Sequence, residues 1–200
     1  MPDNPLHLAI IVGSTRQGRF APTVAQWFAT QAAQRDGLTI DVIDLVEAQL
    51  PEVLSDQRTP AVAAVSARLS RADAFVVITP EYNHSFPAPL KTLIDWHSQE
   101  WHAKPIGFVS YGGVSGGLRA VEQLRQIFVE VHAMTVRDSV SFAGVWTQFG
   151  SDGQPTNPSH SNRNATKMLN QLVWWGHALR DAKSKRPYAA SSAPISSDST

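Results

Sequence analysis

The stretch LAIIVGSTRQGRF, residues 8–20, places a run of apolar residues directly before a turn rich in glycine, hydroxyl and arginine residues. The run Leu8–Val12 is unbroken and rich in β-branched side chains, which is typical of a strand covered on both faces of a parallel sheet. Pro22 then lies near the first turn of a predicted helix. The stretch therefore predicts strand, loop and helix, the repeating unit of an α/β domain.

The same alternation continues along the chain. Further strands are predicted at Thr39–Ile43, Ala74–Ile78, Pro105–Val109 and Met134–Val136. Amphipathic helices are predicted near Pro22, Pro60 and Pro89, over Leu118–Val131 and from about Arg163. Right-handed crossovers between five strands predict a flavodoxin-like three-layer α/β sandwich, whose five-stranded parallel sheet has the order 2-1-3-4-5. We expect one domain over residues 1–182 and a disordered tail over 183–200, where the composition becomes basic and then rich in Ser and Ala.

Composition excludes several classes of protein. Of the 200 residues, 17 are Lys or Arg and 17 are Asp or Glu, so the formal net charge is +0. Proteins that bind nucleic acid or anionic membranes need clustered positive charge, and neither partner is expected here. The absence of cysteine excludes disulfides and thiolate metal sites. Leu6–Val12 is too short for a signal peptide or a membrane span, so a cytoplasmic protein is expected.

The loop after the first strand has the parts of a phosphate cradle. Its small residues expose backbone N–H groups before a helix, and it carries two hydroxyls, two guanidinium groups and no acidic residue. Gly13 and Gly18 have the spacing of a P-loop, but Arg19 replaces its lysine and Phe20 its Mg²⁺-binding hydroxyl. No Gly-x-Gly-x-x-Gly occurs in the chain. The loop therefore predicts a site for a terminal monophosphate, as in FMN, and the alternative is an ordinary turn with solvated arginines.

The loop after the third strand, Thr79–Pro89, contains three prolines and several polar side chains. A stiff backbone with free N–H groups suits a flat heteroaromatic ring. Glu81 is a candidate general base, although a structural role is more common for a loop carboxylate.

Three segments together resemble the NAD(P)H-dependent FMN reductase family of flavodoxin-like proteins: GSTR at 13–16, PEYNHS at 80–85 and LKTLIDW at 90–96. The likeness extends from about Leu8 to the helix over Leu118–Val131. Ala88 departs from it, because the family commonly has glycine shortly after the loop proline, and the substitution could tighten this loop. The resemblance implies that the first loop binds the FMN phosphate through Ser14, Arg16, Gln17, Gly18 and Arg19. It implies that the second loop contacts the isoalloxazine and ribityl chain through Pro80, Glu81, Tyr82 and Asn83. It also implies that the loop after the fourth strand surrounds the pyrimidine edge with Ser110, Tyr111, Gly112 and Gly113.

The implied function is an FMN-dependent NAD(P)H oxidoreductase with ping-pong kinetics. Its acceptor would be a small molecule: a quinone, an azo compound, free flavin or an oxidised metal ion. No side-chain acid or base is required, because the flavin carries the chemistry. The family also implies a homodimer or homotetramer with the flavin near the subunit boundary, which Trp96, Trp101 and Trp146 could contact. The choice between NADH and NADPH stays open.

Two other functions fit parts of the sequence. A non-catalytic FMN electron carrier is one, although such carriers tend to be acidic and this chain is neutral. A serine hydrolase is the other, because the segment at 113–117 matches Gly-x-Ser-x-Gly around Ser115. Asp138 or Asp152 with His160 or His177 would complete its triad. The residues Asp95, His97, Glu100 and His102 have near-ligand spacing, but we expect helix-end packing and no metal site there.

Overall fold

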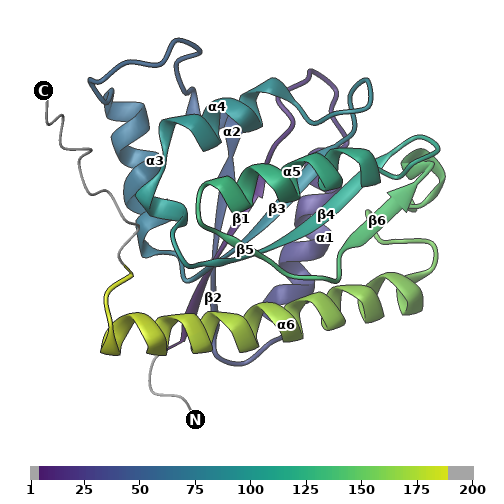
Figure 1. Cartoon of the computed structure of the whole chain (residues 1–200). Coiled ribbons are helices and arrows are strands. Elements are labelled where there is room, and N and C mark those ends of the chain that lie inside the picture. Colours follow the sequence, from purple (N-terminus) through teal and green to yellow (C-terminus); the bar gives the residue numbers. More distant parts are fainter. Residues whose placement is uncertain (1–4, 189–200) are drawn as a thin grey trace, which may run out of the picture.

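The computed structural model describes residues 5–188, which form a parallel sheet flanked by helices on both faces (Figure 1). Its strands are β1 (Leu6–Val12), β2 (Leu38–Asp44), β3 (Ala74–Pro80), β4 (Pro105–Gly112) and β5 (Met134–Thr135), in the order β2-β1-β3-β4-β5. The predicted order is therefore confirmed. A further strand, β6 (Val140–Ala143), also pairs in parallel with β4.

Strand β6 was not predicted, and the register explains its place. β5 pairs with the start of β4 and β6 with its end, so the two short strands follow one another along the same sheet edge. In β6 only alternate side chains are buried, Val140 and Phe142. Four alternating residues after another short strand give little sequence signal.

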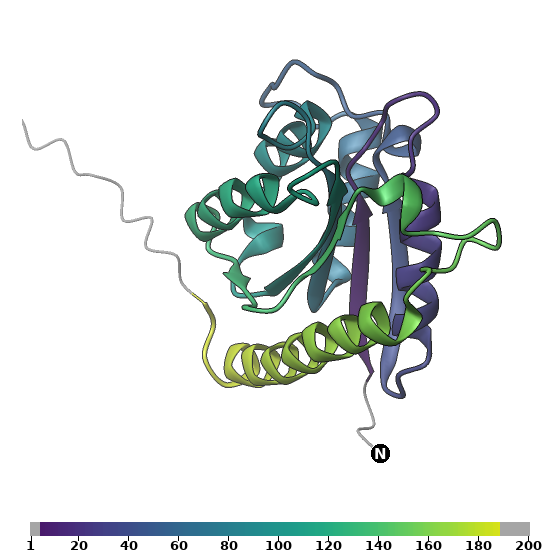
Figure 2. The same cartoon turned by 90° about the vertical axis from the view of Figure 1, so that its right-hand side faces the viewer.

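Helices cover both faces of the sheet and complete three layers. The helices are α1 (Ala21–Ala33), α2 (Leu45–Ala48), α3 (Pro60–Arg71), α4 (Ala88–Trp96), α5 (Leu118–Glu130) and α6 (Pro158–Lys185), with 3₁₀ turns η1 (Gln99–Trp101) and η2 (Val145–Thr147). Apolar residues of α1 and α6 form one core with the sheet, and those of α3, α4 and α5 form the other. Figure 2 shows α1 and α6 together on one side of the strands. The continuous apolar runs of β1, β3 and β4 follow from this double coverage.

The last helix is longer than its apolar pattern predicts. It begins at Pro158 rather than near Arg163, because Asn157 caps it by accepting a hydrogen bond from the His160 N–H. It continues to Lys185, so the expected domain boundary at 182 falls inside the helix. The remainder of the expected tail, residues 189–200, lies outside the described residues.

Three of the tryptophans lie inside the protein. Trp27 is fully buried, and its Nε1 donates to the Asn162 side-chain oxygen. Trp96 and Trp101 are also buried, and both donate to backbone carbonyls of their own chain. Over residues 5–188, no helix is long and apolar enough to cross a membrane. No group of three potential metal ligands occurs within that same range.

Candidate functional site

The loops after β1, β3 and β4 meet beyond the carboxyl ends of the strands and line a cavity of about 430 Å³. This volume lies within the range of small-molecule and cofactor sites. Its lining consists of Ser14, Arg16, Gln17, Gly18, Arg19, Phe20, Pro80, Glu81, Tyr82, Tyr111, Gly112, Gly113, Val145 and Trp146. Of the residues predicted from the sequence, all but Asn83 and Ser110 are therefore brought together.

The first loop presents a row of free backbone donors. The N–H groups of residues 14–18 donate to no acceptor within the described chain, whereas Gly13 N–H still pairs with the Ile78 carbonyl of β3. The Arg16 side chain is exposed and makes no hydrogen bond or ion pair with residues 5–188, whereas the Arg16 backbone carbonyl accepts from the Arg19 N–H at 3.2 Å. Gly18 has a positive φ of 66°, which glycine adopts without strain and which turns the chain back toward α1. Consecutive free N–H groups before a helix form a site for an anion.

Arg19 differs from Arg16 because it is already paired. Its guanidinium donates two hydrogen bonds of 2.6 Å to the Asp44 carboxylate, one to each oxygen, and another of 2.5 Å to the Ser14 carbonyl. Asp44 raises the pKa of Arg19 above its ordinary value. The ion pair holds the first loop against the end of β2, and Arg19 therefore supports the cradle without offering it a free charge.

Three hydroxyl groups meet at the inner wall of the cavity. Ser14 Oγ and Tyr82 Oη share a hydrogen bond of 2.8 Å, which joins the loops after β1 and β3. The Tyr111 hydroxyl is buried and makes no hydrogen bond of normal geometry in the described part of the chain, although the Ser14 hydroxyl, itself bonded to Tyr82, lies close enough to act on its pKa. Burial raises the pKa of Tyr111, so this hydroxyl keeps its proton and remains a donor at neutral pH. A buried donor without a partner is costly, and a ligand acceptor in the cavity would satisfy it.

Glu81 joins the second and third loops. Its carboxylate accepts hydrogen bonds from Ser115 Oγ (2.5 Å), the Arg119 side chain (3.1 Å) and the Arg119 N–H (3.3 Å). These contacts assign Glu81 a structural role. They also disfavour the hydrolase, because the Ser115 hydroxyl bonds to a carboxylate where a triad requires a histidine.

Asn83 and Ser110 have other tasks. Asn83 and His84 both have positive φ, 49° and 71°, and they form the tight turn between the paired residues Tyr82 and Ser85. Asn83 is exposed at the tip of that turn. Ser110 is fully buried and its Oγ donates to the Gly116 carbonyl, which fixes the loop after β4 from below.

A fourth segment, η2, completes the cavity and was only partly foreseen. Gly144 N–H donates to the Gly113 carbonyl (2.9 Å), and Val145 is buried as an anchor. The next residue, Trp146, lines the cavity yet is 71% exposed. In the sequence, Trp146 follows Gly144 closely and comes after the third loop, which was the only indication that it lies near the site. Nothing in the sequence indicated that this turn is bonded to Gly113.

The residues present fit FMN. The free N–H row and Arg16 suit its phosphate, and the unpartnered Tyr111 hydroxyl offers a donor to a polar ligand group. A Cβ atom built on Gly113 would meet nothing within 4 Å, so the cavity has open space above this backbone. A flat ring can approach such a backbone closely.

Comparisons with known proteins agree with this site. A quinone reductase of Escherichia coli (strain K12) is 35% identical over 150 residues, which cover 70% of this chain and 78% of the relative. An NAD(P)H-dependent FMN reductase of Schizosaccharomyces pombe is 34% identical over 122 residues, covering 55% of this chain and 60% of the relative. The fold matches a Paracoccus denitrificans flavoenzyme, an NAD(P)H:(acceptor) oxidoreductase, with TM-score 0.70 and 22% identity over 86% of this chain and 98% of that one.

A family model, "NADPH-dependent FMN reductase", matches residues 6–147, well over half of the chain. The match contains every loop of the cavity, including η2. The predicted family, the oxidoreductase class and the pairing of FMN with NAD(P)H are thereby confirmed. The chain belongs to the NADPH-dependent FMN reductase family.

Proposed function

We propose that the chain passes two electrons from NAD(P)H to a small acceptor in a ping-pong sequence, at the cavity beyond the carboxyl ends of β1, β3 and β4. The acceptor classes are quinones, azo compounds, free flavins and oxidised metal ions, with a quinone first because the E. coli relative is named a quinone reductase. FMN, when bound, supplies the redox chemistry. The observation that carries the proposal is the union of the free N–H row, the unpartnered Tyr111 hydroxyl and the open space over Gly113 in one cavity.

The chain's own residues bind and orient. Arg16 and the backbone of residues 14–18 hold the phosphate, and the hydroxyl of Tyr111 donates to a polar atom of the cofactor. Glu81 accepts hydrogen bonds from Ser115 and Arg119 and thereby holds the second loop against the third. These bonds fix the cavity wall formed by the two loops. No residue is assigned as a general acid or base.

The proposed ping-pong order is supported by the presence of one cavity at the three loops. Its volume of about 430 Å³ suits a single cofactor, so we expect the reductant and the acceptor to use the same side of the bound ring in turn. NAD(P)⁺ must then leave before the acceptor binds. Trp146, exposed at the rim, offers an aromatic face to the planar ring of whichever molecule occupies that side.

The arginines bear on the choice of reductant. Arg19 is paired with Asp44 and Arg119 with Glu81, so neither offers a free charge to the 2′-phosphate of NADPH. If Arg16 serves the FMN phosphate, then Arg16, Arg19 and Arg119 are all committed. We expect kcat/KM values for NADH and NADPH within about tenfold of each other.

We further propose a cytoplasmic homodimer or homotetramer with the cavity near a subunit boundary. Val53 is 80% exposed and Leu54 51%, in the segment that follows α2. Large apolar side chains exposed together are typical of interaction surfaces. Light scattering on the eluting protein tests the assembly: a dimer or tetramer mass agrees with the proposal, and a monomer mass at micromolar concentration contradicts it.

Initial rates test the reaction. With FMN bound and 1,4-benzoquinone as acceptor, double-reciprocal plots against NADH at several quinone concentrations should give parallel lines. Converging lines would contradict the ping-pong order while leaving the reductase in place. If FMN binds but no steady NAD(P)H oxidation occurs with any acceptor class, the electron carrier would replace the enzyme.

A further inference from the structure

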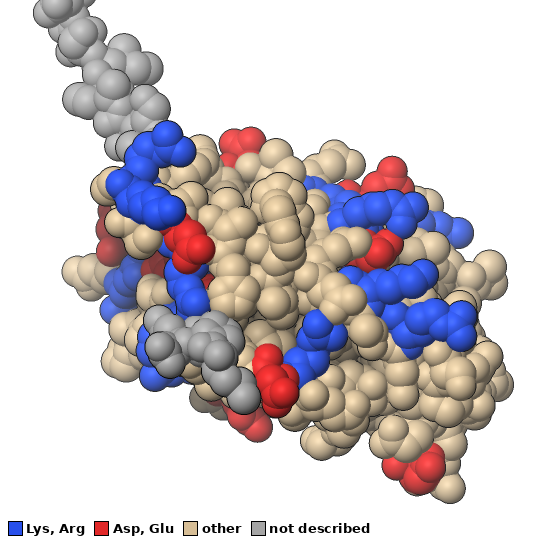
Figure 3. All heavy atoms as spheres, turned by 90° about the horizontal axis from the view of Figure 1, so that it is seen from below, with Lys and Arg blue, Asp and Glu red and all other residues tan. Residues whose placement is uncertain are grey.

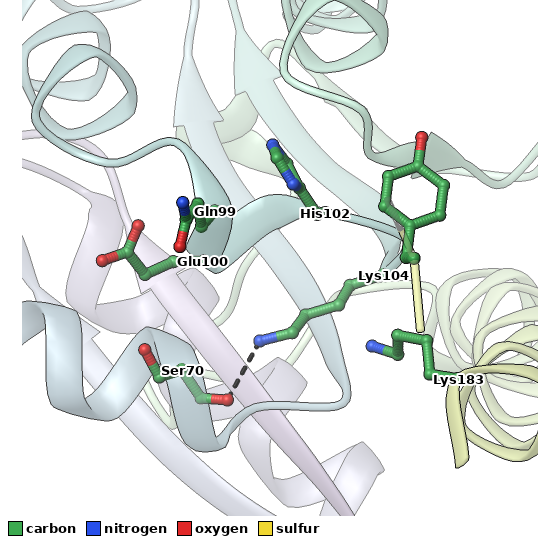
Figure 4. A pocket seen from close by; sticks show the side chains of 7 residues that line it. Ser70, Gln99, Glu100, His102, Lys104 and Lys183 are labelled. Carbon is green, nitrogen blue, oxygen red and sulfur yellow. Dashed lines mark hydrogen bonds between the residues drawn. The ribbon is translucent and has the colours of Figure 1, made fainter. Parts of the chain in front are cut away.

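A second cavity, of about 580 Å³, lies at the opposite end of the sheet from the cofactor cavity (Figure 4). Lys104 lines it and immediately precedes β4, whereas the cofactor loops follow the carboxyl ends of the strands. The eight residues of β4 extend about 26 Å, so the two cavities are far apart. The lining consists of Ser70, Gln99, Glu100, His102, Lys104, Lys183 and Tyr188.

Lys104 is the buried cation of this cavity. The residue is only 7% exposed, and its Nζ donates to the Leu69 and Ser70 carbonyls at the end of α3, at 2.8 and 3.1 Å. An ammonium group has three donors, so one remains after these two bonds. Lys183, from the last turn of α6, reaches toward the same space (Figure 4). Seen from below, basic side chains lie toward both sides of this face of the molecule, with acidic ones among them (Figure 3).

Neither lysine has a carboxylate partner among residues 5–188. The nearby Glu100 is paired with Arg58 at 2.9 Å, and Figure 4 shows its carboxylate directed away from the two lysines. Asp73, the other acidic neighbour, is paired with Arg180 at 3.5 Å. The positive charge that faces the cavity therefore has no paired carboxylate, although Lys104 Nζ also lies over the Phe75 ring, 5.4 Å from its centroid.

The lowered pKa values of Lys104, Lys183 and His102 agree with a cavity in which little negative charge faces these side chains. Burial, together with the Lys183 charge, lowers the pKa of Lys104 to about 8. Burial also lowers the pKa of Lys183, and burial with the neighbouring His132 lowers that of His102. An anion in the cavity would favour the charged form of all three groups.

We propose that this cavity is a second binding site, independent of the cofactor site, for a small molecule that carries a phosphate group. Lys183 and the third donor of Lys104 hold the phosphate oxygens. His102 adds a further charge when it is protonated, and the Gln99 amide adds a neutral donor. The Tyr188 hydroxyl already shares a hydrogen bond of 2.9 Å with His132 Nδ1, so Tyr188 contributes its ring to the wall of the cavity. The volume exceeds that of a single phosphate, which leaves room for an organic portion.

Calorimetric titration of the FMN-saturated full chain with inorganic phosphate, and separately with pyrophosphate, tests the proposal at constant ionic strength. Saturation with FMN removes the cofactor's phosphate cradle from the measurement. We expect one saturable site per chain for at least one of the two probes. Lys183→Gln should weaken binding at least tenfold, while Lys167→Gln, an exposed lysine elsewhere on α6, should leave it unchanged. Lys104 is unsuitable as the first variant because it also caps α3.

The pH dependence gives a second readout. From pH 7 to 9 the affinity should fall several-fold as Lys104 loses its proton, and binding at pH 8 should take up protons, seen as a heat that changes with the buffer's ionisation enthalpy. Lys183 faces Lys104 from α6, His102 precedes it on the chain, and Asp73 and Glu100 are the acidic neighbours. Absence of saturable binding by both probes, or equal binding by the Lys183 and Lys167 variants, would overturn the proposal.

Discussion

Arg19 and Asp44 form a bidentate ion pair that joins the loop after β1 to the end of β2, with both hydrogen bonds at 2.6 Å. Both side chains are largely buried, 15% and 18% exposed. Asp44 also caps α2 by accepting from the Val46 N–H. One pair thus fixes the loop, the strand end and the short helix relative to one another.

Arg19→Ala should lower the free energy of unfolding by about 2–3 kcal/mol, because it removes two charge-assisted hydrogen bonds and leaves the partly buried Asp44 carboxylate without its counter-charge. Urea denaturation of the FMN-free protein measures this loss. A change below 0.5 kcal/mol would show that the pair is not formed in solution. Arg137→Ala, at a side chain that is 90% exposed, serves as the matched control and should leave the stability unchanged.

Arg16→Ala should have the complementary effect. The folded protein should keep its stability, because the Arg16 side chain pairs with nothing in the described chain, while FMN binding should weaken by about 1.5–3 kcal/mol. Riboflavin lacks the phosphate, so its affinity should hardly change. Fluorescence titration with both ligands measures the difference, and equal losses for FMN and riboflavin would show that this loop does not hold the phosphate.

Tyr111→Phe should have opposite effects on the FMN-free protein and on FMN binding. Without FMN, removal of a buried, unpartnered hydroxyl should leave the unfolding free energy unchanged or raise it by up to about 1 kcal/mol. With FMN, the lost hydrogen bond should weaken binding by about 1 kcal/mol. Unfolding and titration experiments on the same variant check both halves. Destabilisation of the FMN-free protein together with unchanged FMN affinity would contradict the role given to this hydroxyl.

Trp146→Ala should raise the KM of a quinone acceptor several-fold with little change in kcat, because the lost aromatic face contributes about 0.5–1.5 kcal/mol of stacking. Trp146→Phe should restore most of the affinity. Trp174→Ala, at another exposed tryptophan but on α6, is the control and should leave KM unchanged. An unchanged KM in Trp146→Ala would remove this residue from acceptor binding.

The lowered pKa of Lys104 predicts that the free energy of unfolding rises as the pH becomes alkaline. Its pKa is about 8 in the folded chain and near 10.5 when unfolded, so between these values the unfolded chain binds more protons. The unfolding free energy should therefore increase between pH 8 and 10.5 in phosphate-free buffer. Lys104→Met should flatten this part of the curve relative to the unmodified chain, as measured by urea denaturation at each pH. An identical slope in the two proteins would contradict the lowered pKa.

The sequence predicted the sheet order because the strongest signals, the apolar runs of β1, β3 and β4, lie in its centre, where coverage on both faces demands continuous apolar residues. The candidate loops could be located for the same reason, since they follow those strands directly. The features that could not be predicted depend on tertiary contacts, which differ between residues that look alike in the sequence. Arg16 and Arg19 are three positions apart in one loop, yet only Arg19 reaches Asp44, which belongs to another strand. The hydrogen bond from Ser115 to Glu81 likewise depends on the packing of two loops, because the two residues are 34 positions apart in the sequence.

Strand β6 and the turn η2 illustrate the same limit. Both are short, and both owe their conformation to contacts with β4 and Gly113 rather than to their own residues. Tertiary contacts commonly override weak local preference in such segments. The amino-terminal extension of α6 depends on one cap, Asn157, ahead of the apolar pattern that revealed the helix.

The central claim is that the three loops hold FMN where NAD(P)H can reduce it. The most direct measurement is the visible absorption spectrum of the purified protein with stoichiometric FMN, recorded before and after anaerobic addition of NADPH. We predict a flavin band that is perturbed by binding and bleached by NADPH, with weaker perturbation in Arg16→Ala. A flavin spectrum identical to that of free FMN, unbleached by NADPH or NADH, would contradict both the cavity's assignment and the proposed reaction.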